Sequence, residues 1–122
     1  MKKFFKNKKI LIAGISGFVG KNLALHLIKH GAKITGTYKE NKPKFTSKKI
    51  NLLNLDLTNK KECLKACKNI DYIFMCAANS SGAQIIEKKP LTHLTPNLIM
   101  NSLILETAYE AGVKKLCFIS SS

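Results

Sequence analysis

The sequence feature that most constrains the fold is a glycine-rich loop between a buried apolar run and a helical pattern. Residues 9–13 are almost continuously apolar, which is typical of a strand buried on both faces of a parallel sheet. Residues 14–20 then have the spacing Gly-x-x-Gly-x-x-Gly, and apolar side chains recur at helical spacing over residues 18–30. A strand, a glycine turn and a helix in this order predict a loop that binds the phosphates of a dinucleotide. The alternative is a structural turn that binds nothing.

Each glycine of this loop has its own physical role in that prediction. Gly14 permits the tight turn after the strand, Gly17 lets the backbone approach a pyrophosphate, and Gly20 lets the helix pack closely. The start of the helix supplies free N–H groups and a positive potential for the phosphates. We therefore expect cofactor contacts from Gly14, Ser16, Gly17, Phe18, Val19 and Gly20.

The rest of the chain continues the alternation of strands and helices. Further strands are predicted at residues 33–38, 50–53, 71–77 and 115–119, and further helices over about residues 58–68 and 94–111. Cys63, Leu64 and Cys67 are expected on the inner face of the first of these helices, and the apolar spacing of the second is marked by Leu98, Leu105 and Ala108. This alternation predicts an α/β fold: a Rossmann-type doubly wound parallel sheet of about five strands with helices on both faces.

The strongly basic composition raises the question of a different partner. The formal net charge is +14, which alone would suggest a nucleic acid or an anionic membrane surface. All 21 basic residues are lysines, however, and lysine lacks the bidentate guanidinium that suits phosphates and guanine edges. Because the lysines are spread through every segment, we expect a solvated surface and no dedicated nucleic-acid site.

Cysteine usage and hydropathy indicate the compartment. The 4 cysteines, which are Cys63, Cys67, Cys76 and Cys117, form no Cys-x-x-Cys pair, so we expect free thiols and no metal site. No segment approaches the roughly 20 apolar residues that a membrane span needs. We therefore expect a cytoplasmic protein with no membrane partner.

Beyond the glycine loop, four more motifs follow in a fixed order, at residues 55–58 (Leu-Asp-Leu-Thr), 71–78, 96–101 and 112–121. Together with residues 10–23 they resemble the extended short-chain dehydrogenase/reductases, the NAD(P)-dependent epimerase/dehydratase family. The resemblance covers essentially the whole chain and corresponds to the N-terminal Rossmann part of the family. It implies binding of a nicotinamide dinucleotide and oxidoreduction at a sugar carbon of a nucleotide-sugar substrate.

The resemblance also implies roles for particular residues. In the family, the aspartate of the Asp-Leu-Thr segment contacts the adenine amino group, paired alanines end the fourth strand beside the cofactor, and an asparagine opens the long helix. The corresponding cofactor contacts here are Asp56, Leu57, Ala77, Ala78 and Asn97. The catalytic serine of the family corresponds to Ser121 or Ser122. The alternatives are that Asp56 only caps the next helix, that Asn97 only begins the long helix, and that the serines are an ordinary strand end.

The end of the second strand bears on the choice of cofactor. Relatives that prefer NAD carry an acidic residue there, which bonds the adenosine ribose and repels a 2′-phosphate. This chain has Tyr38 and then Lys39, and the nearest acid, Glu40, falls in the following loop. We predict NADP as the cofactor, with Lys39 and Lys42 facing the 2′-phosphate. NAD is the alternative.

The catalytic tyrosine and lysine of the family are expected outside this chain. The family uses a tyrosine as acid/base with a lysine four positions later, and we expect none of Tyr38, Tyr72 and Tyr109 to be that tyrosine. Tyr109 is assigned to the surface or packing of the long helix. We expect residues 1–122 to be the N-terminal part of a single NAD(P)-binding domain without its substrate-binding domain, inactive alone. We also expect partly uncovered apolar surface on the first helix layer, the fifth strand and the long helix.

Three hypotheses of function follow, in order of preference. The first is the NAD(P)-binding part of a nucleotide-sugar epimerase, dehydratase or reductase. Members of the family that it resembles often pair into homodimers through the long helix and a partner helix, and that partner helix is expected outside these residues. The second is a non-catalytic module that binds NADP(H) through the same loop. The third is a lysine-rich nucleic-acid-binding protein, for which binding would depend strongly on salt.

Overall fold

The computed structural model describes residues 5–40, 42–44, 50–76 and 90–119. Along the chain the elements are β1 (Lys9–Ala13), α2 (Phe18–Lys29), β2 (Lys33–Tyr38), β3 (Ile50–Asn54), α3 (Lys60–Cys67), β4 (Tyr72–Met75), α5 (Pro90–Ala111) and β5 (Lys115–Phe118). The strands form one 5-stranded sheet in the order β3-β2-β1-β4-β5, and every neighbouring pair is parallel. The predicted Rossmann-type fold is confirmed.

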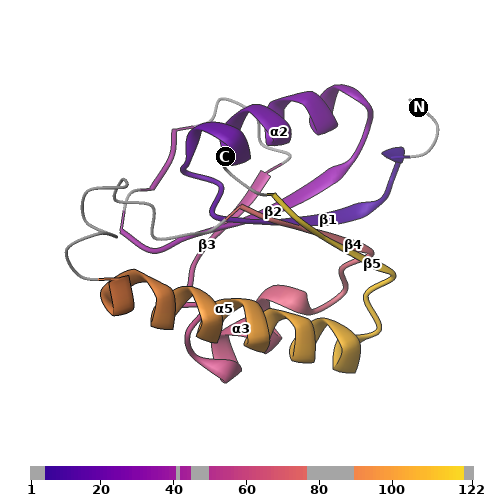
Figure 1. Ribbon diagram of the computed structural model, residues 1–122. Coiled ribbons are helices and arrows are strands. Elements are labelled where there is room, and N and C mark those ends of the chain that lie inside the picture. Colours follow the sequence, from indigo (N-terminus) through magenta and orange to yellow (C-terminus); the bar gives the residue numbers. More distant parts are fainter. Residues whose placement is uncertain (1–4, 41, 45–49, 77–89, 120–122) are drawn as a thin grey trace.

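Helices cover both faces of the sheet (Figure 1). The helix α2 lies on one face, and α3 and α5 lie together on the other. Successive side chains of β1 alternate between the two layers: Ile10 and Ile12 join the apolar cluster under α2, and Leu11 and Ala13 join the cluster under α3 and α5. All four are fully buried. The central position of β1 therefore explains its almost continuous apolar sequence.

Local sequence sets the ends of the helices. Asn59 caps α3, because its side-chain oxygen accepts hydrogen bonds from the N–H groups of Lys61 (2.9 Å) and Glu62 (3.3 Å). Gly31 and Gly112 follow α2 and α5 with φ angles of 84° and 77°, a left-handed conformation that glycine adopts without steric cost.

Most predicted element bounds agree with the structure. The strands β1 and β2 have the predicted bounds, β3 extends to Asn54, and β4 and β5 are shorter than predicted. The helix α5 begins at Pro90 rather than at residue 94. Proline is well accepted at a first helical position, because the N–H that it lacks would have no partner within the helix.

The inner face of α3 was predicted only in part, and the apolar spacing noted in α5 includes exposed positions. Cys63 and Cys67 are buried as expected, but Leu64 is 39% exposed. On α5, Ala108 is buried, whereas Leu98 is 55% exposed and Leu105 52%. The buried positions that replace them are Ala66, Ile104 and Thr107. Both helices carry apolar residues on more than one side, so helical spacing alone does not identify the side that meets the sheet.

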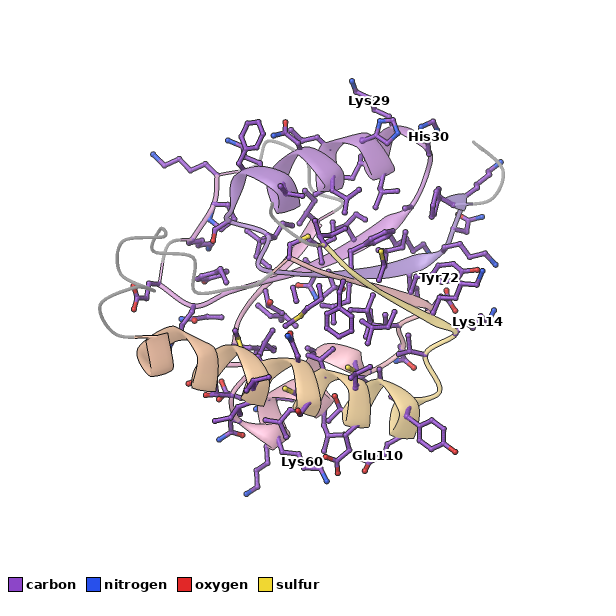
Figure 2. The ribbon with its side chains drawn as sticks, viewed as in Figure 1. Lys29, His30, Lys60, Tyr72, Glu110 and Lys114 are labelled. Carbon is purple, nitrogen blue, oxygen red and sulfur yellow. The ribbon has the colours of Figure 1, made fainter. Side chains whose placement is uncertain are left out.

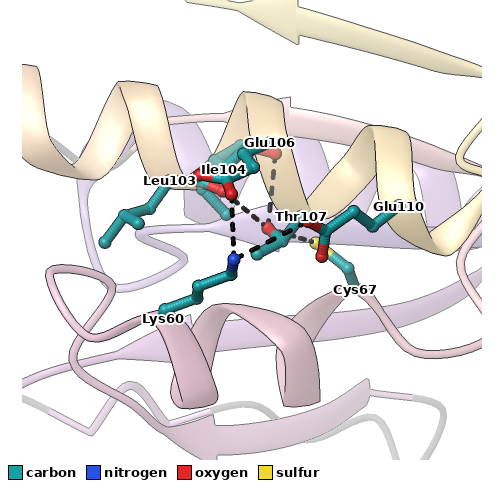
Figure 3. A network of polar contacts seen from close by, with 7 residues as sticks. All are labelled: Lys60, Cys67, Leu103, Ile104, Glu106, Thr107 and Glu110. Atoms are coloured by element: carbon teal, nitrogen blue, oxygen red, sulfur yellow. Dashed lines mark hydrogen bonds and ion pairs between the residues drawn. The ribbon is translucent and has the colours of Figure 1, made fainter.

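Polar contacts join α3 to α5 (Figure 3). At the surface, the Lys60 ammonium lies 2.8 Å from a carboxylate oxygen of Glu106 and 3.6 Å from one of Glu110. Deeper between the helices, Cys67 Sγ and Thr107 Oγ1 are 3.5 Å apart, and the Thr107 hydroxyl donates to the carbonyl of Leu103 (2.8 Å). The buried hydroxyl is therefore hydrogen-bonded, as burial of a polar group requires.

Apolar side chains remain exposed on β5 and α5, as expected. The strand β5 is an edge strand of the sheet, and its Phe118 is 43% exposed. Tyr109, on the outer side of α5, is 88% exposed and so lies on the helix surface. Within the described residues, no helix combines the length and apolar character that a membrane span requires.

Candidate functional site

The carboxyl ends of the strands meet at one edge of the sheet. Because the strands are parallel and in register, Ala13 pairs with Thr37 and with Met75, and Tyr38 pairs with Asn54. The loops that follow β1, β2 and β3 therefore leave the sheet side by side. These loops and the first turn of α2 contain most of the predicted cofactor contacts, and this edge is where open α/β sheets bind ligands.

Two glycines of the loop between β1 and α2 are required by the fold itself. Gly14 has a φ of 81°, a left-handed conformation that residues with a Cβ atom rarely adopt. At Gly20, a Cβ atom would collide with the carbonyl oxygen of Gly14 and lie 3.0 Å from the Cα of Ile15. Gly14 therefore makes the turn, and Gly20 lets the first turn of α2 pack directly on it. Both agree with the predicted roles.

Gly17 differs, because the fold does not require a glycine there. Its φ of −74° and ψ of 166° suit any residue, and a Cβ atom would come no closer than 3.7 Å to the Gly14 carbonyl oxygen. That distance is an ordinary van der Waals contact. The free space beside Gly17 instead fits close approach of a ligand to the main chain, which is the role that a dinucleotide pyrophosphate requires.

The start of α2 is electrostatically suited to an anion. Gly17 is the N-cap, no side chain caps the helix, and its first turn contains no acidic residue. Ser16, Gly17, Phe18 and Val19 are all exposed, Phe18 to 85%. The N–H groups of the first turn therefore keep their capacity to bond to a phosphate, and the helix dipole favours a negative charge there.

The end of β2 anchors this loop, which the sequence analysis did not foresee. The carbonyl oxygen of Thr37 accepts hydrogen bonds from the N–H groups of Gly14 (3.1 Å) and Ile15 (2.9 Å). The side-chain oxygen of Thr37 also accepts from the Gly14 N–H (3.2 Å), and Ile15 packs against Gly36. The available signal was a glycine inside a strand, which often marks a close approach by another part of the chain.

Asp56 follows β3, and it is not the cap of the next helix. Its Oδ1 accepts hydrogen bonds from the N–H (3.0 Å) and the hydroxyl (2.6 Å) of Thr58. These bonds, with a smaller contribution from the Lys39 charge, lower the pKa of Asp56. The cap of α3 is Asn59, so the alternative reading of Asp56 as the helix cap is wrong. The carboxylate is ionised at neutral pH and can accept from an amino group.

The neighbours of Asp56 include a buried side chain and a lysine. Leu57 is 4% exposed and packs in the cluster under α3, so any ligand contact would come from its main chain. Lys39, which follows β2, is exposed and close enough to influence the Asp56 carboxylate. With its nitrogen facing β2, the Asn54 side-chain amide donates to the carbonyls of Tyr38 (3.1 Å) and Lys39 (3.0 Å). The turn after β2 is thus tied to β3.

Tyr38 was expected not to be the catalytic tyrosine, yet Lys42 follows it at the fourth position, which is the spacing of the expected catalytic pair. The pair that the resemblance implies lies on one helix, where residues four apart share one face. Here Tyr38 ends a strand and Lys42 lies in an irregular segment. The two residues therefore lack the helical arrangement, and Tyr38 remains a candidate for the ribose side of the site.

Several predicted residues lie outside the described part of the chain. Ala77, Ala78, Ser121 and Ser122 are among them. The main chain of Asn97 belongs to α5, seven residues after its start at Pro90 rather than opening it, and its side chain is not among those described.

The cysteine thiols have no evident chemical role in this site. All are free, and burial raises the pKa of Cys63 and of Cys76 to about 11. Thiols with such pKa values stay neutral at pH 7 and are poor nucleophiles and metal ligands. The described residues contain no group of histidine, cysteine and acidic side chains that could hold a metal ion.

Lysines of the described residues lie on more than one side of the molecule. Figure 2 shows Lys29 at the far end of α2, Lys60 below α3 and Lys114 before β5, on three different sides of the molecule. A nucleic-acid site would instead need clustered charge along one face. These three lysines do not form such a face.

Comparison with known proteins identifies relatives of this arrangement. Residues 10–122 match the NAD dependent epimerase/dehydratase family. The chain is 28% identical over 116 residues to GDP-mannose 3,5-epimerase 1 of Oryza sativa subsp. indica, covering 93% of this chain and 31% of that protein. It is 30% identical over 117 residues to sterol-4-alpha-carboxylate 3-dehydrogenase, decarboxylating, of Mus musculus, covering 96% of this chain and 31% of that protein.

Solved structures show the same relationship. An epimerase from Methanothermobacter thermautotrophicus has a TM-score of 0.84 and 26% sequence identity, covering 99% of this chain and 37% of that one. The chain thus spans about a third of the length of these relatives. With its parallel five-stranded sheet and glycine loop, the chain belongs to the NAD dependent epimerase/dehydratase family.

Proposed function

We propose that this chain binds a nicotinamide dinucleotide at the carboxyl edge of its sheet, as the cofactor-binding part of a nucleotide-sugar epimerase, dehydratase or reductase. The observation that carries the proposal is Gly17, a glycine that neither backbone conformation nor internal packing requires. It lies at the uncapped start of α2, where exposed N–H groups and the helix dipole attract phosphate. Family membership supports the same ligand.

The proposal assigns each part of the edge to one part of the dinucleotide. The N–H groups at the start of α2 hold the pyrophosphate, the ionised Asp56 accepts from the adenine amino group, and Tyr38 and Lys39 lie on the ribose side. The residues proposed for the nicotinamide side and the substrate oxygen are Ala77, Ala78, Asn97, Ser121 and Ser122. When bound, the dinucleotide supplies a hydride acceptor or donor.

Within this proposal the cofactor is NADP rather than NAD. The strand β2 ends in Tyr38 and is followed by Lys39, so no carboxylate at the strand end repels a 2′-phosphate. Lys39 and Lys42 are both exposed beside the edge, where their ammonium groups can face that phosphate. Glu40 lies between them and is exposed as well.

The substrate and the catalytic pair belong to the proposal for the whole protein. The relatives named above include a GDP-mannose epimerase and a sterol carboxylate dehydrogenase, and the choice of a nucleotide sugar follows the sequence resemblance. We propose that residues 1–122 are the N-terminal part of one NAD(P)-binding domain. The tyrosine and lysine for acid/base catalysis would then come from elsewhere in the protein.

Titration of the intact protein with NADPH and NADH, followed by nucleotide fluorescence, tests the binding proposal. We expect NADPH to bind more tightly than NADH, and Lys39→Glu to reverse the order because the new carboxylate repels the 2′-phosphate. Lys61→Glu, an equal charge change on exposed α3, is the control and should leave the order unchanged. Binding of neither nucleotide would refute the function, and tighter binding of NADH would refute the preference.

A homodimer through α5 is a second part of the proposal. Leu98, Leu105 and Tyr109 are exposed and recur at helical spacing on the outer side of that helix. A self-complementary apolar stripe of this kind suits a two-fold interface. Leu105→Lys should shift the intact protein from dimer to monomer in light scattering, whereas Leu25→Lys on α2, which is 40% exposed, should not. A wild-type monomer would contradict the proposed dimer.

A further inference from the structure

The position of the glycine loop depends on two residues of β2, for which no contact with the cofactor is proposed. We propose that Gly36 and Thr37 are positioning residues: they fix Gly14 and Ile15 and thereby the N–H groups at the start of α2. The inference rests on the proposed function, because it concerns the loop assigned to the pyrophosphate. Neither residue has to touch the cofactor for this role.

Gly36 provides the space that Ile15 occupies. A Cβ atom at position 36 would lie 2.8 Å from both Cβ and Cγ2 of Ile15. The Ile15 Cβ is bonded directly to the main chain, so it cannot rotate away as the end of a long side chain can. A side chain at position 36 must therefore move the loop itself or separate it from β2. Ile15 is fully buried, so any displacement has to occur within a close-packed interior.

Thr37 fixes the same loop through hydrogen bonds. Its carbonyl oxygen holds the N–H groups of Gly14 and Ile15, and its hydroxyl oxygen gives the Gly14 N–H a second acceptor at 3.2 Å. Thr37 is 1% exposed, so water does not replace a lost acceptor easily. Since Gly14 makes the turn into α2, a change in its position is passed to the start of the helix.

The hydroxyl is tested with two replacements of Thr37 in the intact protein. Thr37→Val keeps the shape but removes the acceptor, and Thr37→Ser keeps the acceptor. We expect Thr37→Val to speed hydrogen exchange of the Gly14 amide in the cofactor-free protein and to weaken NADPH binding by about three- to tenfold. Thr37→Ser should stay within about twofold of wild type, as should the control Thr35→Val, two residues earlier on the same strand.

The space at Gly36 is tested by a pair of substitutions. Gly36→Ala should raise exchange of the Gly14 and Ile15 amides and weaken NADPH binding by about tenfold or more. Adding Ile15→Ala removes the Cγ2 and Cδ1 atoms that crowd the new methyl group, so the double variant should recover part of the affinity relative to Gly36→Ala. Circular dichroism establishes that each variant is folded.

The possible outcomes separate this inference from the proposed function. If the wild-type protein binds no dinucleotide, the proposed function fails, and amide exchange alone still decides whether β2 positions the loop. Equal exchange and affinity for Thr37→Val and Thr37→Ser would overturn the role of the hydroxyl. A folded Gly36→Ala protein with wild-type exchange and affinity would overturn the role of Gly36.

Discussion

Replacing the three loop glycines one at a time should separate folding from cofactor binding. Gly14→Ala places a side chain at a φ of 81°, which costs about 1–2 kcal/mol of stability. Gly20→Ala puts a methyl group against the Gly14 carbonyl oxygen, and backbone atoms on both sides of that contact have to move. Overpacking of this kind costs about 1–3 kcal/mol.

Gly17→Ala should leave stability almost unchanged. Its φ of −74° is compatible with alanine, and the new methyl group makes only an ordinary contact at 3.7 Å. Alanine reduces the conformational freedom of the unfolded variant, which adds about 0.4–1 kcal/mol of stability to the folded state. Alanine is also a poorer helix N-cap than glycine, which removes about 1 kcal/mol. The two effects nearly cancel. Affinity for NADPH should nevertheless fall by at least about tenfold, since the methyl group occupies the space proposed for the pyrophosphate.

Urea unfolding and NADPH titration of the intact protein give the two quantities. Because the sequence has no tryptophan, unfolding is best followed by far-ultraviolet circular dichroism. The expected pattern is a loss of stability in Gly14→Ala and Gly20→Ala, and a loss of affinity without a loss of stability in Gly17→Ala. Wild-type affinity in a folded Gly17→Ala protein would refute the reasoning. So would a loss of stability as large as that of Gly20→Ala.

Two further predictions concern the core and the acid range. Leu27 lies on the buried side of α2 and is 2% exposed, so Leu27→Ala should lower the free energy of unfolding by about 3–5 kcal/mol. Leu25→Ala, at a position 40% exposed on the same helix, should lower it by less than about 1.5 kcal/mol. Equal urea midpoints for the two variants would contradict this packing. The folded-state pKa of Asp56 is lowered from 3.8, so its ionised form stabilises the fold above pH 3.8, and that contribution is lost as the pH falls through the lower folded value. Asp56→Asn keeps the Oδ1 acceptor for Thr58 but has no such titration. Its stability deficit relative to wild type should therefore shrink between pH 7 and pH 3, and a deficit that stays constant would contradict the assignment.

Local sequence carried enough information for the elements and for the glycine loop. The bounds of β1 and β2 follow from short apolar and β-branched runs closed by glycine or polar residues. The roles of Gly14 and Gly20 follow from a turn between adjacent elements. These features depend on residues close together in the chain, whose preferences can be judged without knowing the rest of the fold.

Other features depend on which distant segments meet. Helical spacing in α5 did not distinguish Ile104, which is buried, from Leu105, which is 52% exposed. The contact between Ile15 and Gly36 arises only because β1 and β2 pair in parallel with Ala13 opposite Thr37. The effect of Lys39 on Asp56 likewise requires β3 beside β2.

The sequence by itself therefore determined the order of elements, the fold class and the position of the glycine loop, because backbone conformation and apolar periodicity are local properties. The tertiary structure decided which side of each helix is buried, that Asn59 rather than Asp56 caps α3, and that β2 anchors the loop. These outcomes depend on strand order and register, which bring together residues more than twenty positions apart, such as Gly14 and Thr37. Sequence spacing alone does not specify such contacts.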